Sequence, residues 1–420
     1  LSRSSIATFN VFFVIIVSKI IMKKLLVILF LLIINSSFSQ NDYVHQVLIL
    51  NEGYLDFYTD EIIEPVTVGV YSISSFNPSY SQVIEITGAK FASDLIIDGE
   101  YFYVAADDRI LKYNLDTYEL ITSQDVVGAR KLAINGNNLF VSKGDYDSAT
   151  FGPVIFDSYL DVYDLDLNYQ FAFDSQNGPQ WSTENILIND DKLYVLINNA
   201  YEWGNYKGII GQVDLNTLNY ANEIDLGEDG KNPINLMFKD DKLYTLNNKN
   251  WDGSSISVVN INEPGVQTLN LSDVSAGCGV SIIRDQKLNY QKSGDLEMGI
   301  VDLETLTQSG VEDNLNINYY SVSEDPVTGN LFAATADFVT NSQVYVYNSN
   351  NIEIASFTSG VTTNKIVFDV RSASTSVKES HAHQNQIIKS IDLLGRDVID
   401  NNLLLNIYDD GSIEKKYIIK

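Results

Sequence analysis

The feature that most constrains this sequence is a pair of strands that recurs six times between residues 95 and 334. Each copy is an apolar strand, a short polar turn and a second strand rich in Leu, Tyr and Phe. The copies are LIIDGEYFYVA (95–105), LAINGNNLFVS (132–142), ILINDDKLYVL (186–196), LMFKDDKLYTL (236–246), SIIRDQKLNYQ (281–291) and SVSEDPVTGNLFAA (321–334). Their starts lie 37 to 54 residues apart. This spacing predicts four-stranded propeller blades with loops of variable length.

A second motif, similar to Asp-Leu-x-Thr, follows most copies and marks a turn from a third strand to a fourth. It reads YNLDTYEL (113–120), YDLDLNYQ (163–170), VDLNTLNY (213–220) and VDLETLTQ (301–308). Asp and Asn favour such turns because their side chains hydrogen-bond nearby backbone groups. We interpret the repeated aspartates Asp107, Asp190, Asp240 and Asp285 in the same way, as turn formers.

The two ends of the repeat region supply a seventh blade. KIVFDV (365–370) reads as a first strand, and QVLILNEG (46–53), VTVGVYSI (66–73) and SQVIEI (81–86) read as second, third and fourth strands. Joining them closes the ring and leaves no exposed sheet edge. We therefore predict an all-β protein in which residues 44–370 form a seven-bladed β-propeller closed by its N- and C-terminal strands. An eight-bladed ring and an open sandwich are the alternatives.

These motifs resemble the YVTN/YncE-type bacterial surface propellers, whose blades carry a similar Asp-x-x-Thr turn before the outer strand. The opening VLILNEG (47–53) also resembles the N-terminal blade of surface propellers in that superfamily. The resemblance implies the propeller fold and brings no catalytic signature with it. Because related-looking surface propellers include cobalamin-capturing proteins, it adds a corrinoid to the candidate ligands.

Residues 22–39 have the form of a secretory signal peptide, with a basic start, an apolar run at 25–34 and small residues before a cleavage site at Gln40. We interpret residues 1–21 as an over-extended gene start. The rival interpretation is a membrane span, but Lys19 and the lysines after Met22 interrupt the apolar stretch before the roughly 20 residues that a span needs.

Beyond the repeats, residues 371–386 are polar and Ser-rich, which predicts a linker. Residues 387–420 are predicted to form two or three strands, which make up a small C-terminal β segment. The strings IDLLGR (391–396) and DDGSIEKK (409–416) resemble the C-terminal sorting segments of type IX secretion. That resemblance implies transport by the type IX machinery to the medium or outer surface of a Gram-negative bacterium. The alternative is a β-hairpin that packs on the propeller.

Composition narrows the function classes. The net charge of −28 argues against a nucleic-acid partner, which needs a basic surface. Cys278 is the only cysteine, and His45 is the only histidine of the propeller body, so a Ser-His-Asp or Cys-His unit lacks its base. His381 and His383 have no evident third ligand. We predict no metal and no cofactor, with a calcium ion at 144–148 as an alternative.

A ligand is expected on the face formed by the loops from second to third strands and by the connections between blades. This face collects Trp, Tyr and Phe residues together with Asn199, Asn248 and Asp252. Aromatic rings supply apolar contact area and amides fix orientation. The predicted ligand-binding residues are Tyr54, Tyr58, Tyr146, Trp181, Tyr201, Trp203, Tyr206, Trp251 and Phe338. The alternative is that these rings fold back over the propeller and hold no ligand.

We predict a monomeric, non-catalytic binding propeller that recognises a glycan, a small macrocycle such as a corrinoid, or a surface protein. The blades that start at 132, 186 and 236 carry the longest loops and are the favoured place. One alternative is a lactonase- or glycosidase-like hydrolase that uses carboxylates or a bound cation in the central channel. Another is a structural or adhesive surface protein. Convergent Asp, Glu or Asn oxygens at the channel mouth would favour the enzyme.

Overall fold

The computed structural model describes residues 42–73, 77–249, 253–271, 279–292, 294–372, 387–391, 403–408 and 413–417. The expected signal peptide, most of the expected linker, Trp251 and Cys278 lie outside the described residues. The chain divides into two compact units, one of which is Tyr43–Arg371. The other unit contains an antiparallel sheet of β31 (Ile387–Ile391), β32 (Leu403–Tyr408) and β33 (Ile413–Tyr417). No helix in the described part of the chain is long and apolar enough to cross a membrane.

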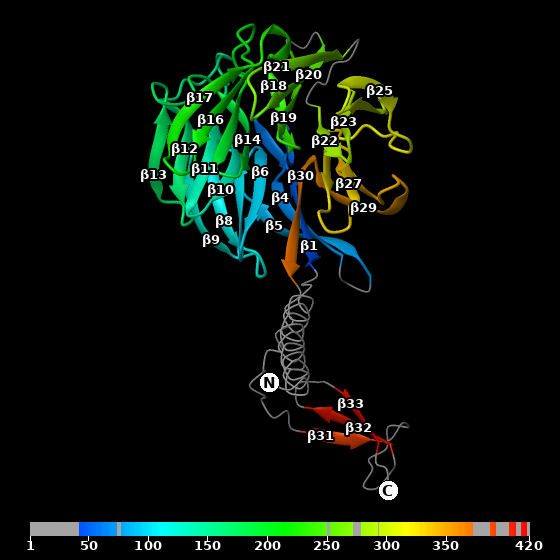
Figure 1. Ribbon diagram of the computed structural model, residues 1–420. Helices are drawn as coiled ribbons and strands as arrows, with labels where there is room; N and C mark the ends of the chain where they lie inside the picture. The colour runs from blue at the N-terminus through cyan, green and yellow to red at the C-terminus, as the bar shows by residue number, and fades with distance from the viewer. Residues whose placement is uncertain are drawn as a thin grey trace, which may run out of the picture. The chain divides into compact units, whose positions relative to one another are not determined.

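Tyr43–Arg371 fold into seven four-stranded antiparallel sheets, the blades, which are arranged in a ring (Figure 1). Blade 1 contains β30 (Thr363–Ser372), β1 (Asp42–Asn51), β4 (Val66–Ser72) and β5 (Ser79–Ile86). Blade 2 contains β6 (Ala92–Asp98), β7 (Tyr101–Ala106), β8 (Arg109–Asn114) and β9 (Leu120–Asp125). Blade 3 contains β10 (Ala129–Asn135), β11 (Asn138–Lys143), β12 (Ser158–Asp164) and β13 (Tyr169–Asp174).

The next four blades follow in chain order. Blade 4 contains β14 (Thr183–Asn189), β15 (Lys192–Ile197), β16 (Ile209–Asp214) and β17 (Asn219–Asp225). Blade 5 contains β18 (Pro233–Lys239), β19 (Lys242–Asn247), β20 (Ser254–Asn260) and β21 (Val266–Leu271), with the 3-10 turn η1 (Glu228–Gly230) before it. Blade 6 contains β22 (Ser281–Arg284), β23 (Lys287–Gln291), β24 (Met298–Asp302) and β25 (Thr307–Val311). Blade 7 contains β26 (Ser321–Glu324), β27 (Leu331–Ala334), β28 (Asn341–Tyr347) and β29 (Glu353–Val361).

The predicted fold is confirmed, including the closure of the ring in blade 1, where β30 from the end of the propeller pairs with β1 from its start. Asn51 at the end of β1 is the centre of a buried hydrogen-bond network at this seam. Its Nδ2 donates to Thr67 Oγ1 at 3.0 Å and to the Tyr80 hydroxyl at 3.1 Å. Its Oδ1 accepts from Thr363 Oγ1 at 2.6 Å. One side chain therefore links β1, β4, β5 and β30.

Neighbouring blades are held together by an aromatic side chain from the second strand. The second strands alternate inward and outward, and each of these rings is at most 2% exposed and packs into a cluster with apolar residues of the next blade. The rings are Tyr103 of β7, Phe140 of β11, Tyr194 of β15 and Tyr244 of β19. The frequent Tyr and Phe of the repeat therefore form the contacts between blades.

The Asp-x-x-Thr motif caps turns. Asp214 Oδ1 accepts hydrogen bonds from the backbone N–H groups of Asn216 and Thr217 at 3.0 and 2.8 Å and from Thr217 Oγ1 at 2.9 Å. The backbone N–H of Thr217 is the main reason that the pKa of Asp214 lies below its usual range. Asp190 and Asp240 adopt φ values of 51° and 49°, which Asp tolerates in tight turns. These aspartates therefore have a structural role in forming turns.

Removing β30 should open the ring, because β1 then loses its partner and the network around Asn51 loses Thr363. We expect a chain truncated after Thr362 to lose its cooperative thermal transition, measured by circular dichroism and calorimetry. The matched control is a chain truncated after Ser372, which keeps the whole of blade 1 and should unfold cooperatively. Equal transition midpoints for the two truncated chains would contradict the role of the seam.

Candidate ligand site at the mouth of the central channel

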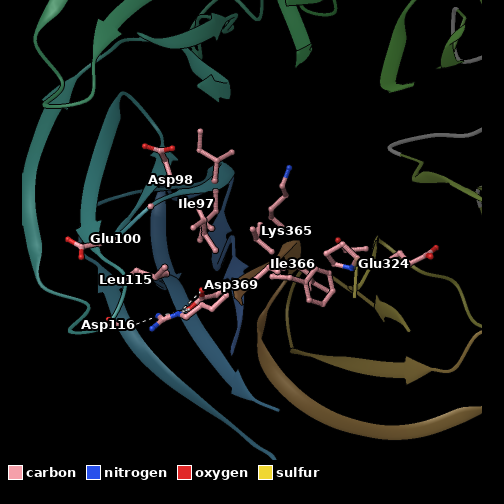
Figure 2. A pocket seen from close by; sticks show the side chains of 18 residues that line it. Ile97, Asp98, Glu100, Leu115, Asp116, Glu324, Lys365, Ile366 and Asp369 are labelled. Carbon is pink, nitrogen blue, oxygen red and sulfur yellow. Dashed lines mark hydrogen bonds and ion pairs between the residues drawn. The ribbon is translucent and has the colours of Figure 1, made fainter. Parts of the chain in front are cut away.

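Two cavities in the described residues lie at opposite ends of the first strands, so they mark the two ends of the central channel. The mouth cavity, of about 590 Å³, lies where the first strands begin. The basal cavity, of about 850 Å³, lies where β6, β26 and β30 run toward their ends (Figure 2). Lys365 of β30 lines both. Residues of all seven blades line the mouth cavity. The site is therefore not confined to the three blades that start at 132, 186 and 236.

The mouth cavity is lined mainly by amide, hydroxyl and charged side chains at the starts of the first strands and in the loops above them. Its lining residues are Glu52, Phe91, Ala92, Ser93, Arg130, Lys131, Glu184, Asn185, Asn198, Ala200, Tyr201, Asn232, Ile234, Asn235, Asn248, Gly279, Val280, Ser281, Tyr320, Ser321, Val322, Asn364 and Lys365. Polar atoms that converge from several chain segments on a concave site are the usual mark of a small-molecule site.

Charge is balanced at the mouth. The Arg130 guanidinium lies 2.7 Å from Glu184 Oε2, and the Lys365 ammonium lies 2.8 Å from Oδ1 of the buried Asp94. The Lys131 ammonium donates to the backbone carbonyl of Ser93. Together with Glu52, the mouth thus has three cations and three carboxylates in a protein whose net charge is −28. The mouth cavity therefore does not strongly attract either anionic or cationic ligands.

Two ionisable groups of the mouth are shifted toward their neutral forms. Burial raises the pKa of Glu52, although the Tyr320 hydroxyl donates to its Oε1 at 3.0 Å and favours the charged form. Burial also lowers the pKa of Lys131, against the effect of nearby Asp94 and Glu184. Groups displaced in this way in a cavity are candidates for function.

Two buried asparagines of the mouth have side-chain atoms without a hydrogen-bond partner among the described residues. Asn248 is fully buried, and both its Oδ1 and its Nδ2 are unpaired. Asn232 is 2% exposed, and its Oδ1 is unpaired. The backbone N–H of Asn248 donates to the carbonyl of Asn232 at 2.9 Å, so the two residues are fixed beside each other. A buried amide without partners costs free energy, which a ligand that hydrogen-bonds to it can recover.

Each aromatic ring that lines the mouth contacts a second ring further from the channel. Phe91 stacks on Phe57 with ring centroids 5.7 Å apart, and Tyr201 stacks on Tyr146 at 6.3 Å. Tyr320 meets Phe338 edge to face at 5.2 Å. The Arg130 guanidinium also lies over the Tyr201 ring, 5.6 Å from its centroid. The structure thus brings three of the residues expected from the sequence, Tyr146, Tyr201 and Phe338, to the mouth or its edge.

The remaining predicted residues that the structure describes do not line the mouth cavity. Tyr54 is half-buried in the small strand β2 (Tyr54–Asp56), which pairs with β3 (Glu61–Glu64), and Tyr58 is fully exposed in the turn between them. Trp181 packs at a blade core with the Lys207 ammonium 4.8 Å from its ring centroid. Trp203 is 79% exposed, and Tyr206, against its edge, is only 4% exposed. Trp251 lies outside the described residues.

Reasoning from loop composition missed Glu52, Arg130, Lys131, Glu184 and Lys365. A signal for them exists in the repeat itself, at the positions just before each apolar first strand. Arg130 and Glu184 lie two residues before Leu132 and Ile186, the starts of their repeats. Because these positions carry charged residues where a buried strand would otherwise be apolar, they identify the channel end of each first strand.

Asp116 and Asp369 line the basal cavity, and with His45 they form the one group of His, Asp or Glu side chains in the described residues whose ligand atoms are close enough for a metal ion. The Arg371 guanidinium pairs with both carboxylates, at 2.8 Å from Asp369 Oδ2, and Figure 2 shows Asp116 and Asp369 on either side of these contacts. Gln46 Nε2 also donates to Asp369 at 3.0 Å. The positive charge that a metal would supply is already present, so this group belongs to the ring closure.

Comparison with known proteins supports the fold and adds no family. No family model matches the sequence, and no curated protein matches it. A hypothetical selenium-binding protein from Sulfolobus tokodaii is similar in structure, with a TM-score of 0.58, 10% identity, and coverage of 78% of this chain and 94% of that one. A candidate 6-phosphogluconolactonase from Bacteroides fragilis has a TM-score of 0.53 and 14% identity, with 77% and 98% covered.

At these identities the likeness shows the fold alone. The chain is a seven-bladed β-propeller, closed within blade 1, with a polar cavity at the loop end of its channel. What that cavity does has to be argued from its own residues.

The raised pKa of Glu52 predicts a pH-dependent stability. The folded state holds the Glu52 proton more tightly than the unfolded chain, so the free energy of unfolding falls as pH rises from the ordinary Glu range through the raised pKa. The Glu52→Gln variant cannot ionise at this position, so its free energy of unfolding does not fall for this reason. We expect the melting temperature of Glu52→Gln to increase relative to that of the wild type as pH rises from about 4 to about 8.

The control for this experiment is Glu85→Gln, at an exposed position on β5. Its melting temperature should follow that of the wild type across the same pH range. A constant difference between Glu52→Gln and the wild type at all pH values would refute the assignment of a raised pKa to Glu52.

Neighbouring asparagines at the end of β19 should respond in opposite ways to the same substitution. Asn247 is fully buried, and its Nδ2 donates to Ser255 and Ser257 Oγ at 3.0 and 2.9 Å. Asn247→Leu should lower the free energy of unfolding by about 1–3 kcal/mol because these hydroxyls lose their partner. Asn248→Leu should leave it unchanged within about 0.5 kcal/mol or raise it, since no bond is lost. Denaturant titration measures both, and equal losses would contradict the unpaired state of Asn248.

Proposed function

We propose that the mouth cavity binds a saccharide without transforming it. The observation that carries this proposal is a pair of buried amides, Asn232 and Asn248, which line the polar cavity. Both Oδ1 atoms and the Asn248 Nδ2 have no hydrogen-bond partner in the described residues. A sugar hydroxyl donates and accepts hydrogen bonds at once, so one ligand can satisfy both the acceptor and the donor groups of these amides. An apolar ligand would leave them unsatisfied.

The electrostatics and shape of the mouth support the same class of ligand. A charge-balanced site suits a neutral molecule, and the cavity of about 590 Å³ is in the range of ordinary small-molecule sites. Phe91, Tyr201 and Tyr320 offer ring surfaces for the apolar faces of a sugar ring. A corrinoid or other flat macrocycle needs a broad apolar wall, and amide and charged groups dominate the lining described here.

A second candidate function is hydrolysis of the bound sugar, which Glu52 favours. A carboxyl group whose pKa is raised by burial retains its proton near neutral pH more readily, and it can donate that proton to the leaving oxygen of a glycosidic bond while water adds to the sugar. Glu184, held by Arg130, is the neighbouring carboxylate. Release of reducing sugar by the wild type but not by Glu52→Gln would establish this function over simple binding.

We also propose that the protein is exported and acts outside the cytoplasm. Residues 22–39 support this as a signal peptide, and the similarity of residues 387–420 to type IX sorting segments supports transport across the outer membrane by that machinery. The blade motifs similar to YVTN/YncE-type surface propellers agree with a place at the cell surface. Such a location would expose the mouth to environmental or cell-surface glycans.

Titration of the purified protein with mono- and oligosaccharides, followed by calorimetry and by saturation-transfer NMR, tests the binding function. We expect at least one sugar to bind, and Asn248→Leu to weaken that binding about tenfold through the loss of one or two hydrogen bonds. Exposed Trp203→Ala serves as the control and should bind as the wild type does, since Trp203 does not line the mouth.

If no sugar binds, or if Trp203→Ala weakens binding as much as Asn248→Leu does, the mouth cavity is not a saccharide site. The second result would move the site to the exposed loop aromatics.

A further inference from the structure

A side groove between blades 2 and 3 opens directly from the mouth cavity. This groove is a cavity of about 350 Å³ that shares Phe91, Ser93 and Arg130 with the mouth. It leads away from the channel past Gly128 and Tyr146. The two cavities therefore adjoin at these three residues, one at the mouth of the channel and the other between two blades.

We propose that the ligand is a chain, a neutral oligosaccharide whose terminal sugar occupies the mouth and whose following sugars lie in this side groove. The inference rests on the proposed function and specifies its ligand. A single sugar would occupy only part of the mouth and leave the groove to solvent, whereas a short chain would use both parts.

Aromatic contacts continue from the mouth into the groove. Tyr201 lines the mouth, Tyr146 lines the groove, and their rings are stacked with centroids 6.3 Å apart. Phe91 lines both parts and is stacked on the exposed Phe57. Stacked rings on the path between two polar sites provide apolar surface for successive sugars of one chain.

Two glycines in the wall of the groove pack closely against neighbouring side chains. Gly128 has φ of +74°, and a Cβ there would lie 2.7 Å from Phe156 Cζ. A Cβ on Gly144 would lie 2.9 Å from Ser182 Cβ and 3.0 Å from Tyr201 Cε2, so a side chain would displace Tyr201. The backbone conformation and the close approach both require glycine at these positions. A larger residue at either position would therefore disturb the wall of the groove.

The charge of the groove selects the kind of chain. Asp107, Asp108 and Asp145 line it, and their described partners are backbone N–H groups, such as Phe91 N–H at 3.0 Å from Asp107 and Gly128 N–H at 2.9 Å from Asp108. The Lys90 ammonium is paired with Asp60, which does not line the groove. Carboxylates accept hydrogen bonds from hydroxyls and repel other carboxylates, so the groove should admit neutral sugars and reject uronic acids.

The experiment compares chain length and charge. The probes are gluco-oligosaccharides and chitin oligomers of one to five sugars, with galacturonic acid oligomers of the same lengths, measured by calorimetry on the full propeller. For the neutral series that binds, we expect the affinity to rise at least about tenfold from one sugar to three or four and then to level off. The acidic oligomers should gain nothing with length.

Four variants test which residues cause the gain in affinity with chain length and the rejection of acidic chains. Tyr146→Ala should reduce the ratio of monosaccharide Kd to tetrasaccharide Kd toward one, because the groove loses its ring. Asn248→Leu should weaken all lengths by a similar factor and leave the ratio intact. Tyr169→Ala is the matched control, since Tyr169 is an exposed tyrosine on β13 that lines neither cavity. Asp145→Asn should improve the binding of acidic oligomers.

The outcomes separate the two proposals. If a monosaccharide binds but affinity does not rise with chain length, or if Tyr146→Ala leaves the ratio unchanged, the groove inference is wrong and the saccharide function stands. Preference for galacturonic acid oligomers would overturn the charge argument for neutral chains. If no probe of any length binds, the saccharide function fails and the groove inference fails with it.

Discussion

The pairing of β30 with β1 is the constraint on which the rest of the molecule depends, because it closes the ring and fixes the site. Asn51 joins the two strands at the loop end through Thr363. Glu52 follows Asn51 directly, and Asn364 and Lys365 follow Thr363, so the residues next to the seam line the mouth cavity. The Glu52 N–H also donates to the Thr362 carbonyl at 2.9 Å. A defect in closure would therefore displace part of the site before it unfolded the whole propeller.

Closure also explains how a strongly acidic chain can have a charge-balanced mouth. Seven first strands begin around one axis, and each contributes a short polar segment to a small space. Arg130 and Lys131 of blade 3 come together there with Lys365 of blade 1, which is far from them in the sequence, and Glu184 and Asp94 neutralise two of these cations. Away from the axis, acidic residues such as Asp214 are solvated turn caps with no common target. The same composition thus has different consequences at the axis and at the surface.

The sequence predicted the fold well because a repeat shows the same periodicity many times over. The closure was predictable for a related reason, since KIVFDV (365–370) could not be left as an unpaired first strand. The candidate site was harder, because its residues are single positions taken from seven blades and no contiguous motif contains them. Loop composition drew attention to aromatic residues, but it could not distinguish Tyr201, which lines the mouth cavity, from Tyr206, which is buried against the exposed Trp203.

The two ends of the channel differ in how far their polar groups are satisfied, and this difference points to the loop end as the functional one. At the basal end Asp369 accepts from Gln46 and Arg371, and Tyr118 donates to Gln46 at 2.6 Å, so the network is complete within the protein. At the mouth, Asn248 has the same residue type and burial as Asn247 but has no side-chain partner in the described residues. A buried amide without hydrogen bonds does not stabilise the folded state, and an apolar residue of similar size would make the protein more stable. The unpaired amide of Asn248 therefore supports the proposal that a ligand binds at the mouth.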